Sequence, residues 1–416
     1  MRDGLSDGRT GAGATLVALA ALNFFLADAR DGLGPFLDAY LATNGWSPFA
    51  LGLVATGGGV LGMAATPLFG ALVDGTPYKR ALIVIPVLLM TAAALLTLSL
   101  PNVAVVVGGQ AVTALVGAVI GPALMGLTLG LVGEARFMAQ VSRNEFWNHA
   151  GNVVSLAGVY AATALFGHAG IVGLMVLTAL GAAVATLTID PRRIDHKVAR
   201  GLGVDAGEPG PSGYSVLVHT PGLILLGVIM LVFHFGNAPM SRLVAQEYAI
   251  QLGTPFRTTA LITGVAQLAM IGSALAAPYL IRRFGLAAMF LLALTALPIR
   301  GAIAGSLSGF WAIYPVQMLD GVGAGMLGIV TPIAAERILA GTGRFNVGLA
   351  AVMTLQGIGA STSNLLAGWL VERGGYDLAH WVHGGVAVVA LTLFVGWHHK
   401  VVGDEPAVAD PASAAA

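Results

Sequence analysis

The sequence contains no cysteine, and only 10% of its 416 residues are charged. Without cysteine the chain forms neither disulfide bonds nor zinc–thiolate sites, and thiol catalysis is excluded. A soluble protein of this length carries about 25% charged residues, so this chain has too little polar surface to cover itself in water. The formal net charge is zero, so nothing indicates nucleic acid as a partner.

Two further kinds of site are missing from the sequence. No GxxxxGK[ST] phosphate-binding loop occurs, which argues against ATP-driven transport. No nucleophile–base arrangement suited to catalysis is present either, so we expect no enzyme activity and no cofactor. The methionines lack ligand spacing and His398-His399 is interpreted as an interfacial pair, so we expect no metal site.

What the sequence does contain is 56% hydrophobic residues, gathered in long runs. Apolar stretches of about 20 residues cross a bilayer as helices. We predict an all-α integral membrane protein with twelve transmembrane helices in two pseudo-symmetric six-helix bundles. The predicted spans are 14–42, 49–73, 81–99, 103–132, 138–166, 170–189, 220–250, 257–281, 286–306, 310–338, 346–371 and 379–398.

One polar segment in the middle of the chain divides the predicted spans into two sets of six. It carries four basic residues followed by a Gly/Pro-rich run. We predict an N-terminal bundle at 1–189, a cytoplasmic linker at 190–219, a C-terminal bundle at 220–399 and a disordered cytoplasmic tail at 400–416. With the N-terminus inside, the short outer loops receive only Arg257 and Arg373, which predicts cytoplasmic termini in the cell inner membrane.

The two halves resemble each other at a nearly constant offset. Residues 47–49 (Ser-Pro-Phe) recur as 254–256 (Thr-Pro-Phe), 207 positions later, and the pattern Gly-x-x-Arg-Phe at 133–137 recurs at 341–345. Duplication explains this shared spacing better than chance does. Paired six-helix repeats are typical of secondary transporters.

The loop after the second span reads GALVDGTPYKR from Gly70 to Arg80. It resembles the loop between helices 2 and 3 of the major facilitator superfamily, GxxxDRxGR[KR]. The matching residues are Gly70, Asp74, Lys79 and Arg80, whereas Gly75 and Pro77 depart from the pattern. The resemblance implies that these four matching residues belong to a cytoplasmic gate, in which Asp74 binds a helix N-terminus from the other half.

Two departures concern the drug/proton antiporters of that family. Gln110 aligns where many of them carry an arginine in helix 4. A Gly/Pro run at 117–126 resembles the antiporter motif but lies on the fourth predicted span rather than the fifth. We interpret it as a tight-packing stretch, and drug/proton antiport stays open.

Ionisable residues inside spans are functional candidates, because a charge at membrane depth costs about 3 kcal/mol on insertion scales. On the first span these are Asp28, Arg30 and Asp31, with Asp38 nearer the outer surface. They are interpreted as a proton- or substrate-binding face, or alternatively as a structural ion-pair cluster.

The fifth span carries Glu145, Asn148, His149 and Asn152 within an arc of about 100° on a helix. This face is suited to hydrogen bonding toward a cavity, and His149 with Glu145 is suited to carrying a proton. The alternative is a polar network that holds neighbouring helices together.

In the second half, the candidates are His234 and Asn237 on the seventh span and Gln317 and Asp320 on the tenth. A His234/Asp320 pair is suited to proton coupling. Alternatively, Asp320 neutralises Arg300, which we interpret as structural. Two carboxylates near span ends, Glu247 and Glu336, are expected to be solvated.

Together these patterns predict a monomeric secondary transporter that moves a small molecule across the bilayer by alternating access. Proton-coupled efflux is favoured by analogy with exporters that share the loop, with sodium open as the coupling ion. The spans lining the cavity would be 1, 4, 7 and 10, as the resemblance implies. The alternatives are a proton-coupled importer of a small polar metabolite and a non-transporting membrane receptor or scaffold.

Overall fold

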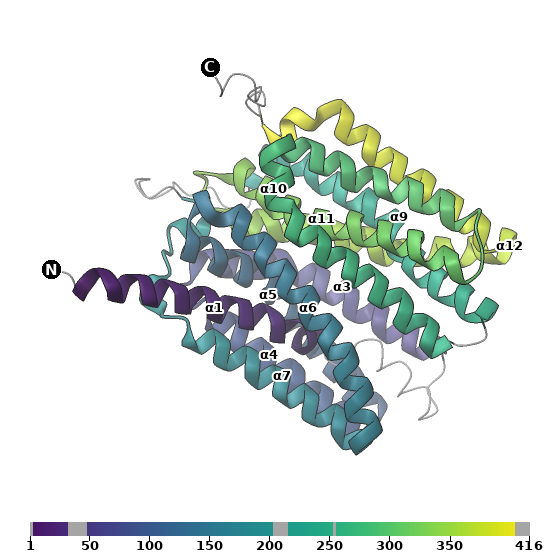
Figure 1. Cartoon of the computed structure of the whole chain (residues 1–416), viewed down its shortest axis with the longest axis horizontal. Coiled ribbons are helices and arrows are strands. Elements are labelled where there is room, and N and C mark those ends of the chain that lie inside the picture. Colours follow the sequence, from purple (N-terminus) through teal and green to yellow (C-terminus); the bar gives the residue numbers. More distant parts are fainter. Residues whose placement is uncertain (1–2, 32–47, 203–214, 253–254, 404–416) are drawn as a thin grey trace. The chain divides into compact units, whose positions relative to one another are not determined.

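The structure, a computed structural model, describes residues 3–31, 48–202, 215–252 and 255–403. Within these ranges the chain is helical and contains no β-strand (Figure 1). Eight of the described helices are long and apolar enough to cross a membrane. The predicted all-α membrane fold is therefore confirmed, and the helix pattern is consistent with twelve spans.

The first part of the chain forms six long helices. They are α1 (Asp3–Asp31), α3 (Pro48–Gly75), α4 (Ala81–Ser99), α5 (Val103–Val132), α6 (Glu134–Phe166) and α7 (His168–Thr188). Helix α1 begins well before the predicted span at residue 14, and residues 32–42 of that span lie outside the described residues. Two short 3₁₀ turns follow, η1 (Pro191–Arg193) and η2 (Val198–Arg200).

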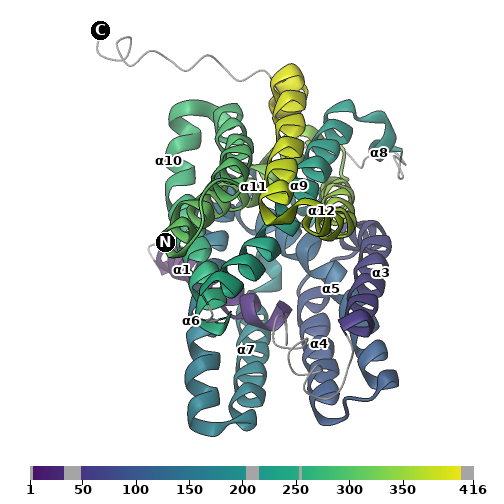
Figure 2. The same ribbon diagram turned by 90° about the vertical axis from the view of Figure 1, so that its right-hand side faces the viewer.

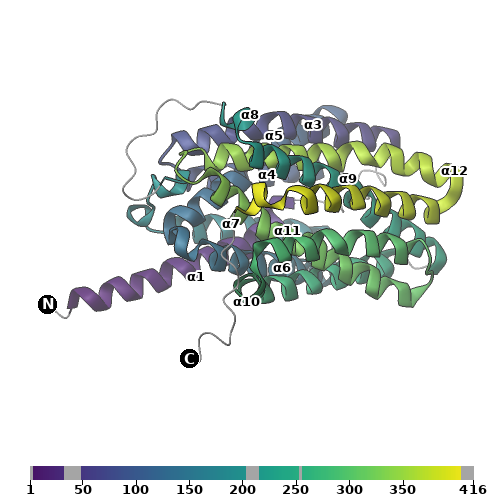
Figure 3. The ribbon, with the colours of Figure 1, turned by 90° about the horizontal axis from the view of Figure 1, so that it is seen from above.

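The second part contains longer elements. They are α8 (Val216–His219), α9 (Pro221–Leu252), α10 (Pro255–Ala304), η3 (Phe310–Ala312), α11 (Ile313–Leu339) and α12 (Phe345–Val402). Two of them each hold two helices: α10 turns at Gly285, with φ 84°, and α12 turns at Gly374 and Gly375. Figure 3 shows α12 folded back on itself. Both turns fall between predicted spans.

Large apolar side chains are exposed along the helices. On α7, Leu180, Val184 and Leu187 are 51%, 59% and 56% exposed. A spacing of four and three residues puts them on one helix face. An exposed apolar stripe along a helix of this length is suited to contact with lipid.

The chain divides into two compact units, residues 1–207 with 343–350, and residues 208–342 with 351–416. Helix α12 therefore starts in the first unit and continues in the second. In the first unit, α1 packs against α6 and α7, while α5 packs against α3 and α4. Helices α6 and α7 run side by side in Figure 2.

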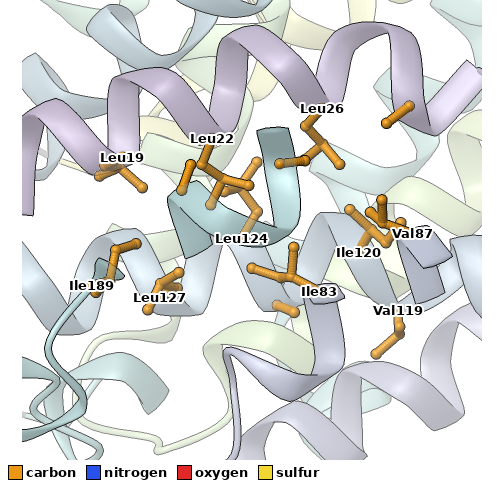
Figure 4. Close-up of a cluster of buried hydrophobic side chains, with 14 of the residues drawn as sticks. Leu19, Leu22, Leu26, Ile83, Val87, Val119, Ile120, Leu124, Leu127 and Ile189 are labelled. Atoms are coloured by element: carbon orange, nitrogen blue, oxygen red, sulfur yellow. The ribbon is translucent and has the colours of Figure 1, made fainter. Parts of the chain in front are cut away.

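The core of the first unit joins five of its helices, α1, α3, α4, α5 and α7. Leu19, Leu22 and Leu26 lie along one side of α1 and pack in a cluster with side chains such as Ile83 of α4 and Leu124 of α5 (Figure 4). Lipid tails are as apolar as this core, so close packing rather than removal from water favours helix association in a bilayer.

Close packing in the second unit depends on small residues. A Cβ added at Gly321 of α11 would lie 2.4 Å from the backbone oxygen of Ala266 in α10. A Cβ at Gly359 of α12 would lie 2.1 Å from the backbone oxygen of Leu231 in α9. These backbones touch with no side chain between them, as is common between transmembrane helices.

The first described part of the predicted linker, residues 190–202, is folded. Ile194, Val198, Ala199 and Leu202 are buried. The Asp195 amide donates to the carbonyl of Gly130 on α5 at 2.9 Å. The linker therefore begins as a segment packed on the first unit.

Candidate functional site

Two sites stand out, one in each unit. The first surrounds Asp74 at the end of α3. Its carboxylate is only 3% exposed and accepts from Asn346 Nδ2 at 2.8 Å, the Val347 amide at 3.0 Å and the Asn346 amide at 3.4 Å. The first amides of a helix lack partners within the helix and favour negative charge. Asp74 thus binds the N-terminus of α12, the type of contact that the sequence resemblance implied.

Glycines allow the start of α12 to approach this closely. A Cβ at Gly70 would lie 2.6 Å from Ala350 Cβ and 2.7 Å from the Asn346 carbonyl oxygen. A Cβ at Gly126 would lie 2.7 Å from Asn346 Oδ1. Asn346 Nδ2 also donates to the Ala199 carbonyl at 2.8 Å, so one amide joins Asp74 to the folded linker.

The basic pair of the loop binds helix C-termini. Lys79 is fully buried, and its ammonium donates to the carbonyls of Val73 at 3.0 Å and Thr76 at 3.1 Å. Arg80 donates to the carbonyls of Leu187, at 3.2 Å, and Ile189. These contacts satisfy carbonyls at helix ends, where cations are favoured.

Burial lowers the pKa of Lys79 to about 8, because the charged ammonium loses its hydration. The Asp74 carboxylate opposes this shift, and Arg200 adds to it. The pKa of His196 in the linker is also lowered, first by burial and then by the charge of Lys79. The loop and the linker therefore share one electrostatic environment.

The second site, the Arg300 cluster, comprises Arg300, Asp320, Asn237, Ser241 and Gln317. Arg300 of α10 is fully buried, and its guanidinium donates to Asp320 at 2.8 Å, Asn237 at 2.8 Å, Gln317 at 2.9 Å and Ser241 at 3.1 Å. The acceptors come from α9 and α11. The alternative in which Asp320 neutralises Arg300 is thus the arrangement present, and the charge is compensated as a buried ion requires.

His234 lies near this cluster without joining its hydrogen bonds. The hydrogen bonds described for Asp320 run to Arg300 and Ser241, whereas His234 Nδ1 contacts the Met230 carbonyl at 3.0 Å. His234 is still within electrostatic reach of Asp320. The structure therefore brings three of the four predicted residues of the second half, Asn237, Gln317 and Asp320, onto one guanidinium.

On α6, Glu145 Oε2 and His149 Nε2 are 3.6 Å apart, and Asn148 and Asn152 are half-buried on the same helix. The predicted polar face is therefore present. On α1, the backbone of Asp28, Arg30 and Asp31 is helical, but their side chains and Asp38 lie outside the described residues. Their predicted roles remain predictions.

Sequence reasoning missed several polar contacts. Gln140 donates to Asn144 at 2.8 Å, and Asn144 donates to Thr128 at 2.9 Å, all buried in the first unit. One turn of spacing between Gln140 and Asn144 was the available signal. The role of Asn346 had no sequence signal, because its partners lie far away in the chain.

The expectation for the two carboxylates near span ends was wrong. Glu336 is 8% exposed and Glu247 is 5% exposed. Glu247 Oε2 lies 2.9 Å from Nε2 of His380, because the second helix of α12 packs over the end of α9. The described residues contain no group of three or more side chains suited to a metal ion.

Comparison with known proteins adds to this geometry. The family profile of the Major Facilitator Superfamily matches residues 16–299. An uncharacterized MFS-type transporter of Mycobacterium tuberculosis (strain ATCC 25618 / H37Rv) is 38% identical over 387 residues, covering 91% of each chain.

Solved structures with the same fold are distant in sequence. The proton:xylose symporter XylE is 13% identical with a TM-score of 0.72, covering 94% of this chain and 96% of that one. A bacterial homologue of the iron transporter ferroportin is 15% identical with a TM-score of 0.70, covering 93% and 99%. The human organic anion transporter MFSD10 is 14% identical with a TM-score of 0.68, covering 91% and 98%.

Proposed function

This chain belongs to the major facilitator superfamily, and from that premise we propose that it is a proton-coupled secondary transporter that exports a small molecule by alternating access. We place it in the cell inner membrane as a multi-pass protein, with the N-terminus, C-terminus and linker on the cytoplasmic side. Its partners are the substrate, the coupling proton and the bilayer, and it acts as a monomer.

The observation that carries the transport part of this proposal is the Arg300 cluster. A fully buried guanidinium within a membrane-spanning helix is costly and marks a functional site by default. Its acceptors on α9 and α11 are side chains whose bonds can be exchanged for bonds to a polar substrate. The cluster therefore supports substrate binding in the second unit.

The Asp74 site supports alternating access. Its three hydrogen bonds to the start of α12 come from two backbone amides and one side-chain amide. Such a contact can be broken and remade as a unit when the helix moves. We propose that it stabilises the state that is closed to the cytoplasm.

Proton coupling is assigned to the carboxylates of the spans, with Asp28, Asp31 and the Glu145/His149 pair as carriers in the first unit. Glu145 and His149 lie 3.6 Å apart, close enough to share a proton through small rotations. The direction, export, is supported by the resemblance of the 70–80 loop to that of many exporters, which is an argument by analogy.

The test is growth of an efflux-deficient bacterium that expresses the protein, across antibiotics, dyes, metal salts and metabolites. Wild type would be compared with Asp28→Asn, and with Glu372→Gln as a control that neutralises an exposed carboxylate. Export predicts resistance to some compound, lost in Asp28→Asn and kept in the control. Substrate flux across liposome membranes that does not depend on a pH gradient would refute proton coupling.

A second candidate is import of a small polar metabolite. It is favoured by the chemistry of the Arg300 cluster, whose amide, hydroxyl and carboxylate groups suit a polar ligand better than an aromatic drug. Uptake predicts sensitisation to a toxic compound rather than resistance. A receptor or scaffold would instead show altered partner binding with no flux in liposomes.

A further inference from the structure

A second buried ionisable site lies in the second unit, apart from the hydrogen bonds of the Arg300 cluster. Glu247 of α9 and His380 of α12 contact each other at 2.9 Å, with side chains 7% and 0% exposed. The other carboxylate oxygen of Glu247 accepts from Gln251 Nε2 at 2.8 Å. Both oxygens of Glu247 therefore have protein partners, and the pair is held in one geometry.

Polar atoms without hydrogen-bond partners occur in this pair and in two residues within electrostatic reach of it. Within the described part of the chain, His380 Nδ1, the Tyr248 hydroxyl and both ring nitrogens of His383 are buried and lack hydrogen bonds. A buried polar group without a hydrogen-bond partner is unfavourable, because it has lost its hydration and gained nothing in return. Four such atoms on three neighbouring residues exceed what packing requires, and they point to a use in which these groups exchange protons.

The surroundings of the pair are defined on three elements. Tyr248 of α9 lies within electrostatic reach of Glu247, and Arg300 of α10 lies within electrostatic reach of Tyr248. On α12, His383 lies one turn from His380, and the exposed Asp377 also acts on Tyr248. An exposed carboxylate and the Arg300 cluster therefore both act electrostatically on Tyr248, next to the pair in the sequence.

Close backbone packing fixes the position of His380. A Cβ at Gly301 of α10 would lie 2.9 Å from the His380 carbonyl oxygen and 2.6 Å from Gly384 Cα. The two helices touch here without intervening side chains. The ring of His380 is consequently held against Glu247 by the helix contact as well as by its own hydrogen bond.

We propose that Glu247 and His380 form a proton-binding site of the second unit. With one proton bound, the pair holds an imidazolium beside a carboxylate and is neutral overall. When the proton leaves, a neutral imidazole remains beside the carboxylate, and the site carries one negative charge. Tyr248 and His383 supply the hydrogen-bonding groups through which the proton arrives and departs.

The charges explain why this pair, and not Asp320, takes the proton. Protonating Asp320 would leave the Arg300 cation buried without its counter-charge, which is strongly unfavourable. Protonating the Glu247–His380 pair instead removes a buried net charge. Proton binding here does not depend on transport, whereas its use in coupling rests on the proposed function.

The experiment reads the imidazole rings directly. Protein labelled with [15N]histidine in lipid nanodiscs would be titrated between about pH 5 and 9, the range in which histidine changes charge. His380→Gln assigns the signal, Glu247→Gln removes the carboxylate, and His219→Gln serves as a control at an exposed histidine. Thermal unfolding of each variant checks that it folds. Glu247→Met removes the carboxylate should Glu247→Gln unfold, and Glu247→Asp keeps it.

We expect the His380 ring to change from neutral to doubly protonated within this range. The doubly protonated form should be depleted at every pH in Glu247→Gln, and retained in His219→Gln and Glu247→Asp. A His380 ring that stays in one form throughout would overturn the proposal, as would a titration that Glu247→Gln leaves unchanged. Because the titration measures no substrate flux, its result does not depend on whether the protein transports a substrate.

Discussion

The Arg300–Asp320 ion pair allows a direct test of how the buried charges of the second unit contribute to its stability. Asp320→Asn keeps the size of the side chain but removes the charge that neutralises Arg300. Removing one partner of a buried pair costs about 3–5 kcal/mol. The asparagine oxygen can still accept a hydrogen bond at the same position, 2.8 Å from Arg300 Nη1. We therefore expect the free energy of unfolding to fall by about 3 kcal/mol.

Thermal unfolding of the detergent-solubilised protein measures this loss. For a unit of about 200 residues, 1 kcal/mol corresponds to about 2–4 °C, so Asp320→Asn should lower the melting temperature by about 6–12 °C. Arg300→Met should cost at least as much, because it leaves an unpaired carboxylate. The double variant should be more stable than the sum of the single losses predicts, since neither charge is then alone.

The control is Glu372→Gln, which neutralises an exposed carboxylate of α12 and should shift the free energy of unfolding by less than about 0.5 kcal/mol. An Asp320→Asn variant as stable as wild type would refute the reasoning. So would a double variant whose loss equals the sum of the single losses. If the double variant is stable but carries no substrate, the pair serves function as well as structure.

Three further predictions concern the Asp74 site. Gly70→Ala should speed hydrogen exchange at the start of α12, because its methyl group meets backbone atoms there; Gly75→Ala, with no atom within 4 Å of its added carbon, should leave exchange unchanged. For Lys79, the folded protein releases its proton near pH 8 and the unfolded chain near the ordinary 10.5. The free energy of unfolding should therefore rise by about 3 kcal/mol between these values, a rise that is absent below pH 8 and absent in Lys79→Met. Asn346→Ala should lower the free energy of unfolding by about 2 kcal/mol, because it removes a buried donor from two acceptors, Asp74 and the Ala199 carbonyl. Hydrogen exchange of the linker around Ala199 should also become faster. Unchanged exchange there would contradict the role of Asn346 in joining Asp74 to the linker.

The helical architecture could be predicted because membrane spans have a strong local signal. A span must satisfy its backbone polar groups internally and be apolar over about 20 residues, and both requirements can be recognised in a sequence. The turns at Gly285 and Gly374–Gly375 also fell where the spans were expected to end.

The partners of the polar residues could not be predicted in the same way. Asp74 and Asn346 lie 272 positions apart, and helix periodicity fixes only the face on which each residue lies. Glu247 was expected to be solvated because it lies close to the end of a predicted span. The residue that buries it, His380, comes from a helix 133 positions away.

The linker shows a third limit of sequence reasoning. Charge and glycine content across 190–219 indicate a solvated connection. Yet Val198 and Ala199 supply apolar contacts, and Gly130 leaves room for them, since a Cβ there would lie 2.8 Å from Ala199 Cβ. Whether such a segment packs against the helices depends on a few small residues, and average composition does not show where these residues make contact.

The repeat has a consequence for how the protein evolved. Phe137 and Phe345 occupy equivalent positions of the two halves, and their rings contact each other edge to face, with centroids 5.8 Å apart. If the halves arose by duplication, the half-length ancestor had one phenylalanine that met its own copy across a two-fold axis. A substitution there changed both sides of the contact at once, so any replacement had to pack against itself. On that account, duplication removed the constraint, and each ring could then adapt to its own neighbours.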